Sequence, residues 1–451
     1  MKISNTLLAV ATLLSGLPCL GQTTPSEPGP LKIDLKDALA RARKYGLQIQ
    51  GARLTSASAR EDVKQAKAAR LPSLNALNQF IYTEGNGTPS GVYVGADGVH
   101  VYNEQAQIHQ ELLSLARRGE LRAAQAAEAA ARAKVEIASR GLTLTVVQDY
   151  YAVVVAQRKL AYAQTSLKEA ERFADISGKL EKGGEAAHVD TIKAQIQLQQ
   201  RQRDLSDAEF NVDKAKIGLA VLMFPQLRDD FTLVDDLDNA PILAPMPEIA
   251  TAAKSTSPDI QAAQQSLRAA ALGVSVARYG YLPSFSLDFF YGISANQFAA
   301  TSSDVPESGR STLPSYNVAN RQNLGYQGQV TLNIPVWNWG ATHSKVVQAD
   351  LKRQQAELDL TLAQRTLQST LETGYREARV AQSQLASLKS SLDLSADNLR
   401  LTLLRYQAGE STALEVVDAQ TTLTQARNAY SDGLARYAVA LANLQTLTGT
   451  L

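Results

Sequence analysis

Several features common in other protein classes are scarce in this sequence. Its 451 residues include one cysteine, three methionines and two tryptophans, and the formal net charge is +1. A chain so close to neutral offers no basic surface for nucleic acid and no acidic surface for a basic partner. Beyond the N-terminal segment no apolar run reaches the roughly 18 residues of a membrane helix. A position within a membrane would therefore require a β-barrel, which also satisfies every backbone polar group in lipid.

Residues suited to catalysis do not gather in any recognisable pattern. The four histidines are scattered along the chain at His100, His109, His188 and His343. No HExxH motif, glycine-rich phosphate loop or nucleophile elbow is present. The sequence therefore predicts neither an enzyme nor a resident cofactor or metal ion.

The N-terminal segment is typical of an export signal. An apolar run from Leu7 to Leu17 is ended by the helix breaker Pro18, and small residues up to Gly21 suit a signal peptidase. We expect residues 1–21 to be a signal peptide and the mature chain to lack disulfides and thiol chemistry. The alternatives are a membrane anchor, for which the run is too short, and lipidation of Cys19, whose preceding residues match that signal poorly.

An internal repeat is the most informative feature of the mature chain. Leu71-Pro72-Ser73 recurs as Leu282-Pro283-Ser284. Further matches share one constant offset: Gln157, Leu160, Leu167, Gly184, Ala194 and Gln195 recur as Gln382, Leu385, Leu392, Gly409, Ala419 and Gln420. We interpret the mature chain as two structural repeats, 22–240 and 241–451. Each repeat is expected to contain a helix, two strands and a long helical hairpin.

Two segments of the second repeat alternate between apolar and polar residues. The apolar positions are Phe285, Leu287, Phe289, Tyr291 and Ile293, followed by Leu324, Tyr326, Val330, Leu332 and Ile334. A noisier alternation in the first repeat includes Ala106, Ile108 and Leu112, and the stretch from Ser294 to Asn323 indicates a long loop. Strands with one apolar face suit a barrel with lipid outside and water inside, although a soluble sandwich is an alternative. Four strands cannot close a barrel whose smallest examples have about eight, so several chains must contribute.

Long helices follow the strands in both repeats. No proline occurs from Gly119 to about Lys179, enough for a helix of roughly 90 Å. Apolar residues recur every seven positions, at Val146, Val153, Leu160, Leu167 and Ala174, at Leu198, Leu205, Val212 and Leu219, at Leu385, Leu392, Leu399 and Tyr406, and at Leu423, Tyr430, Tyr437 and Leu444. This period predicts antiparallel coiled-coil hairpins with an apolar core. Their turns are expected at Gly183-Gly184 and Ala408-Gly409, where glycine permits left-handed backbone angles.

Together these features resemble the TolC family of outer-membrane efflux proteins. The resemblance is carried by the duplicated strand-and-hairpin units, by the segment 334–340 (IPVWNWG) and most specifically by 409–420 (GESTALEVVDAQ). It implies a mixed, mostly α fold in which a homotrimer forms a twelve-stranded β-barrel in the outer membrane, four strands from each chain. A long coiled-coil α-barrel would continue this duct into the periplasm. The implied function is the exit duct of a tripartite efflux or type I secretion system, which conducts passively and is gated at its periplasmic end.

The same resemblance implies which residues form the functional end. The acidic pair of the family's gate matches Glu415 and Asp418, and Asp190 is the first-repeat counterpart of Glu415. Carboxylates three positions apart share a helix face, and a threefold ring of them would attract cations. The alternative is an ordinary solvated helix start that favours acids. The turns expected to dock a periplasmic adaptor of an inner-membrane transporter comprise Gly183, Gly184, Glu185, Ala408, Gly409 and Glu410.

The sequence departs from the family pattern at two places, and two other classes of protein share some of its features. Ser411 stands where the family often has arginine, and the turns read Gly183-Gly184-Glu185 and Ala408-Gly409-Glu410, whereas the first hairpin of the family commonly has Val-Gly-Leu. The first repeat also lacks the proline of the second, with Ser114 in place of Pro335. A periplasmic adaptor would also contain a long hairpin, but usually one, flanked by β-rich modules. A structural coiled-coil envelope protein would explain the heptads but not the alternating strands.

Overall fold

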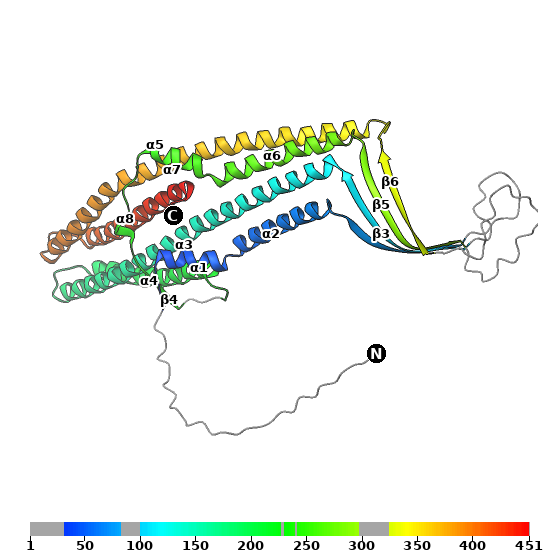
Figure 1. The fold of residues 1–451 in the computed structure, drawn as a ribbon. Helices are drawn as coiled ribbons and strands as arrows, with labels where there is room; N and C mark the ends of the chain where they lie inside the picture. The colour runs from blue at the N-terminus through cyan, green and yellow to red at the C-terminus, as the bar shows by residue number, and fades with distance from the viewer. Residues whose placement is uncertain (1–30, 83–99, 227–229, 240, 297–323, 451) are drawn as a thin grey trace, which may run out of the picture.

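The computed structural model describes residues 31–82, 100–226, 230–239, 241–296 and 324–450. The expected signal peptide, Cys19 and most of the expected long loop lie outside these residues. Figure 1 shows an elongated chain whose long helices run side by side and lead at one end into a thin sheet. Among the residues described, no helix has both the length and the apolar character for a bilayer crossing.

The same order of elements occurs twice along the described chain. The first set is α1 (Leu35–Tyr45), α2 (Leu47–Ala68), β2 (Ser73–Tyr82), β3 (His100–Leu113), α3 (Leu115–Lys182) and α4 (His188–Met223). The second is α5 (Met246–Thr256), α6 (Pro258–Tyr279), β5 (Ser284–Asn296), β6 (Leu324–Asn333), α7 (Ala341–Gln407) and α8 (Ala413–Thr448). The short elements β1 (Leu31–Ile33), β4 (Phe231–Leu233) and η1 (Leu237–Asn239) lie outside this duplicated order.

The single helix expected before each strand pair is broken in two. Gly46 separates α1 from α2, and Ser257 separates α5 from α6, with extended backbone at ψ of 115° and 114°. Ser257 precedes Pro258, and a proline disfavours helical angles at the residue before it. The Ser257 hydroxyl accepts a hydrogen bond from the N–H of Ile260 and so caps α6.

The four longer strands form one antiparallel sheet in the order β2-β3-β5-β6. Directly paired residues lie on the same face of such a sheet. Ile108 pairs with Phe289 on one face, while Asp288 pairs with both His109 and Gln329 on the other. The apolar and polar faces predicted from the alternation are therefore confirmed for these strands.

One residue of the alternating pattern is out of place. Glu111 pairs with Ser286 and the next pair is Leu113 with Phe285, so a β-bulge leaves Leu112 without a ladder partner. An extra residue in one strand shifts the register of the residues that follow it. Leu113, rather than the expected Leu112, occupies the register position opposite Phe285.

The helices extend the sheet as a layer one helix thick. Next to the sheet the order across the layer is α2, α3, α6 and α7, and farther away it is α4, α3, α8 and α7 (Figure 1). α3 and α7 contain 68 and 67 residues and run through both halves, a length of about 100 Å. The expected hairpins are present, but α4 and α8 have only 36 residues each. α2 and α6 complete the half nearer the sheet.

The heptad residues form the predicted core. Each of them is buried or half-buried in the isolated chain. Val146 and Val153 are fully enclosed, and Leu423 and Leu444 are each 2% exposed. The prediction that these residues pack against neighbouring helices is confirmed.

A short segment crosses one face of the helical layer near its middle. We call residues 231–239 the strap. Its strand β4 pairs in parallel with β1, and the Tyr150 hydroxyl of α3 donates to the carbonyl of Val234 at 2.6 Å. The Arg158 guanidinium, also on α3, donates to Asp235 at 2.8 Å and to Asp238 at 2.7 Å. These hydrogen bonds hold the strap against α3.

Candidate functional site: the hairpin turns and the groove beside them

The two hairpin turns have the same backbone structure. In the first, Gly184 N–H donates to the Glu181 carbonyl at 2.9 Å, and in the second Gly409 N–H donates to the Tyr406 carbonyl at 3.1 Å. Gly184 and Gly409 both have φ of +77°, a left-handed angle that costs most other residues free energy. The predicted positions of the turns and the left-handed glycines are confirmed. The predicted docking residues Gly183, Glu185, Ala408 and Glu410 lie in the same turns.

Glu415 has a structural task at the start of α8. The Thr412 hydroxyl accepts from the N–H of Glu415, and a Glu415 carboxylate oxygen accepts from the N–H of Thr412, which together make a capping box. The Ser411 hydroxyl donates to the other carboxylate oxygen at 2.9 Å. These hydrogen bonds, that of Ser411 first, hold the pKa of Glu415 below its usual range.

Arg405 is a residue of this turn that the sequence analysis did not identify. It lies in the last turn of α7, where a guanidinium nitrogen is 3.7 Å from a Glu415 carboxylate oxygen. Another guanidinium nitrogen donates to the carbonyl of Glu410 at 3.0 Å. The family often has an arginine at the position of Ser411, and here Arg405 brings a positive charge to the same turn from the preceding helix.

The other two predicted gate residues have looser surroundings. Asp418 is exposed on α8, and no hydrogen bond or ion pair joins it to another described residue. Asp190 is half-buried in the first turn of α4, with the Lys193 ammonium 3.8 Å from its carboxylate. No direct contact links Asp190 to Glu415 or Asp418 within one chain.

The first turn contains a side-chain hydrogen bond of its own. His188 Nδ1 lies 2.7 Å from a Glu181 carboxylate oxygen across the turn. Hydrogen bonding by Thr191 and His188 lowers the pKa of Glu181. Beneath both turns, Phe173 of α3 and Tyr406 of α7 pack edge to face with ring centroids 5.2 Å apart.

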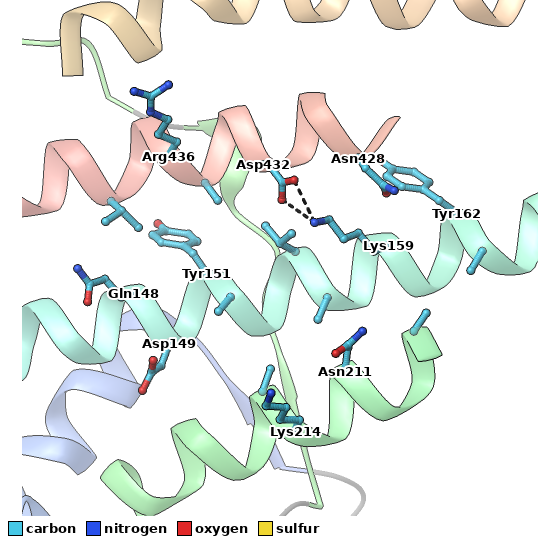
Figure 2. Close-up of a pocket in the computed structure, with 18 of the residues that line it drawn as sticks. Gln148, Asp149, Tyr151, Lys159, Tyr162, Asn211, Lys214, Asn428, Asp432 and Arg436 are labelled. Atoms are coloured by element: carbon cyan, nitrogen blue, oxygen red, sulfur yellow. Dashed lines mark hydrogen bonds and ion pairs between the residues drawn. The ribbon is translucent and has the colours of Figure 1, made fainter. Parts of the chain in front are cut away.

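A groove of about 1240 Å³ runs between α3, α4 and α8. Figure 2 shows its side chains in front of these helices, with the thin chain of the strap region passing behind them. Tyr151 lines this groove, and its side chain is hydrogen-bonded to Asp236 of the strap. The sequence analysis did not identify it, because its walls come from both repeats.

Charged residues line this groove, and most of them are paired. The Lys159 ammonium is 2.8 Å from Asp432, and the Arg436 guanidinium is 2.6 Å from Glu377 (Figure 2 shows the first pair). Asp149 has no such partner among the described residues, and its burial raises the pKa of the carboxyl. Within the described ranges, no group of three or more histidine, cysteine or acidic residues could hold a metal ion.

Comparisons with known proteins agree with this architecture. The sequence model of the family described as outer membrane efflux protein matches residues 37–223 and 249–450. The outer membrane protein TolC of Escherichia coli is 22% identical over 426 residues, which is 93% of this chain and 82% of TolC. The efflux pump outer membrane protein TtgC of Pseudomonas putida is 23% identical over 303 residues, 66% of this chain and 58% of TtgC. The crystal structure of the Campylobacter jejuni CmeC outer membrane channel has a TM-score of 0.76 at 17% identity, covering 92% of this chain and 85% of CmeC.

Proposed function

This chain belongs to the outer membrane efflux protein family, and we propose on that basis that three copies of it close into one continuous duct. It is an outer-membrane efflux channel whose helices extend into the periplasm. Members of the family are channels rather than enzymes. The family match spans both proposed repeats, 22–240 and 241–451, and so supports the channel over a periplasmic adaptor or a structural envelope protein.

The observation that carries the trimer proposal is a pair of uncovered apolar stripes on opposite edges of the protomer. One stripe runs down α7 at Val347, Leu351, Leu358, Leu362, Val380, Leu394, Leu401 and Leu404. The other runs down α2 and α4 at Leu47, Leu54, Val189, Ile192, Ile196, Phe210, Ile217 and Val221. Spacings of three, four, seven, fourteen and eighteen residues keep the members on any one of these helices on a single face of it. Exposed apolar faces this long indicate interfaces with other chains.

The sheet has open edges on the same two sides. Among the described strands, β2 and β6 each pair with one neighbour and so form the two edges of the sheet. Pairing β6 and α7 of one copy with β2, α2 and α4 of the next would cover the strands and the stripes together. Such a head-to-tail interface gives a ring if the rotation closes. Four strands per chain need several copies for a barrel, and relatives of this chain are trimeric channels.

Cysteine crosslinking tests this assembly. Leu54 and Leu358 lie on opposite edges, at similar distances along the helices from the sheet. The double variant Leu54→Cys/Leu358→Cys is expected to form covalent dimers and trimers on oxidation, with no larger species. Each single variant is the control and should stay monomeric in denaturing gels, because a head-to-tail interface does not bring a residue against its own copy. A ladder beyond the trimer, or crosslinking of a single variant, would contradict the closed ring.

The hairpin turns are proposed to close the duct and to dock a periplasmic adaptor of an inner-membrane transporter. They form the end of the helical layer farthest from the sheet (Figure 1). Glu415, Asp418 and Asp190 are proposed to form the gate at this end. Gly183, Gly184, Glu185, Ala408, Gly409 and Glu410 are proposed to form the docking surface.

Substitution of the turn glycines tests the docking proposal. Valine at Gly184 or Gly409 must adopt φ near +77°, which costs about 1–2 kcal/mol at each turn. We expect efflux and adaptor crosslinking to fall while trimers still reach the outer membrane. Gly178→Val is the matched control, because Gly178 lies inside α3 with an ordinary φ and open space around it. Normal efflux with undiminished adaptor crosslinking in both turn variants would place the docking surface elsewhere.

A further inference from the structure

The only two tryptophans of the chain lie together between β6 and α7. We call residues 334–339 the tryptophan loop. Its four large apolar side chains are uncovered: Ile334, Val336, Trp337 and Trp339 are 55%, 88%, 75% and 89% exposed. An exposed apolar cluster of this kind marks a surface that another apolar body covers.

The conformation of the loop keeps both rings on the outside. The indole rings of Trp337 and Trp339 meet edge to face with centroids 5.8 Å apart. Trp339 has φ of +54°, the only positive φ of a non-glycine residue among those described, and such angles are outliers for bulky side chains. The Asn338 amide donates to the Thr342 hydroxyl, which ties the loop to the start of α7. Backbone strain at an exposed aromatic residue points to a functional reason for its orientation.

The position of the loop indicates what covers it. It follows β6 directly, at the end of the apolar row that includes Val330 and Leu332. The chain just before β2 and β5 carries exposed apolar side chains at the same end of the sheet, at Leu71 and Tyr281. Beyond this level the chain continues as helices. Tryptophan prefers the boundary between lipid and water, and aromatic girdles flank the apolar band of membrane barrels.

We propose that the tryptophan loop anchors each protomer in the headgroup region of the phospholipid leaflet that faces the periplasm. This inference rests on the proposed function, in which the apolar face of the sheet meets lipid. The first repeat has no counterpart of the loop. There α3 begins at Leu115 directly after Ser114, and Arg117 is held by Glu111 and Glu120 at 3.1 and 3.2 Å. Each protomer therefore has one anchor, and a trimer has three evenly spaced around its rim.

The native tryptophans provide a direct test, because both belong to the loop. The full trimer is reconstituted in phosphatidylcholine vesicles whose acyl chains are brominated either near the headgroup or near the chain end. Tryptophan emission is then compared with that in unbrominated vesicles and in vesicles with aqueous acrylamide. We expect the shallow bromines to quench the larger part of the emission and the deep bromines to quench much less. Trp337→Phe and Trp339→Phe assign the quenching to each ring.

A single tryptophan on the sheet separates failure of this inference from failure of the proposed function. In a Trp337→Phe/Trp339→Phe background, Val330→Trp should be quenched most by the deep bromines. If it is quenched and the native pair is not, the sheet meets lipid but the loop does not. The proposal that the loop anchors the protomer is then wrong. This holds if Trp337 and Trp339 are quenched by acrylamide, and equally if a neighbouring copy shields them from every quencher. If Val330→Trp is also unquenched by lipid, the proposed membrane orientation fails and the anchor fails with it.

Discussion

Arginine in place of Phe289 or Val330 is expected to destabilise the membrane-inserted protein by about 2–4 kcal/mol per site near the bilayer midplane, whereas arginine at Gln329 costs little. Phe289 and Val330 share the apolar face of the sheet, and Gln329 pairs with Asp288 on the polar face. A guanidinium on the apolar face would have to enter hydrocarbon, while one beside Asp288 would enter water close to a carboxylate.

The three substituted residues lie close together on two paired strands. The variants are therefore matched in their depth in the bilayer and in local backbone geometry. The measurement is the folded fraction in vesicles as a function of urea, read by heat-modifiable migration of the trimer. Equal loss of folded trimer for all three variants would show that the faces do not differ in environment. Loss at Gln329 alone would reverse the orientation of the sheet.

The regular parts of this fold were predictable because each has one dominant period. A strand with lipid on one side and water on the other must alternate, and the position of Ile108 and Phe289 on one face follows from that alternation. A two-stranded helical core requires apolar residues every seven positions, as at Val146 and Val153. Both periods can be recognised within a short stretch of the chain, so a single sequence is enough to detect them.

The irregular parts were not predicted, for reasons that differ from one to the next. The break before α6 had a local signal in Ser257-Pro258 that was missed. The capping box of α8 was also readable, since Thr412 and Glu415 have the required spacing. The bulge beside Glu111 had no comparable signal, because one extra residue changes register without changing composition.

The groove is a different case, because it depends on contacts between the repeats. Lys159 and Asp432 come from α3 and α8 and approach only when the two hairpins pack side by side. Arg405 and Glu415 are closer in sequence, but their 3.7 Å approach depends on the geometry of the turn. Sequence periodicity predicts which helix face such residues lie on, but it does not predict which residue of another helix they contact.

Removing the charges of Glu415 and Asp418 is expected to weaken the block of a reconstituted trimer by a trivalent cation. In the proposed trimer, three copies of each carboxylate surround a narrow aqueous constriction, and crowded like charges favour cation occupancy. We expect the blocking concentration to rise by about tenfold or more when the ring is neutral. The measurement is single-channel conductance in planar bilayers with the cation on the periplasmic side.

The capping role of Glu415 decides which substitution is informative. Alanine would remove the bond to the Thr412 N–H as well as the charge, whereas glutamine can keep the capping box. Glu415→Gln/Asp418→Asn is therefore the test. Glu61→Gln/Asp62→Asn is the control, because it removes two exposed acids per chain from α2, near the sheet.

The pH dependence of the block provides a second reading of the same site. The pKa of Glu415 lies below its usual range, chiefly because the Ser411 hydroxyl donates to its carboxylate. Above the ordinary pKa of glutamate, the Glu415 carboxylate is therefore negatively charged and the cap is intact. Both the charge and the cap are lost only when the pH falls through the lowered pKa of Glu415. We expect block of the parent channel to persist into mildly acidic solution, and Ser411→Ala to shift its loss toward higher pH. If the neutral double variant is blocked as tightly as the parent at every pH, other residues form the constriction.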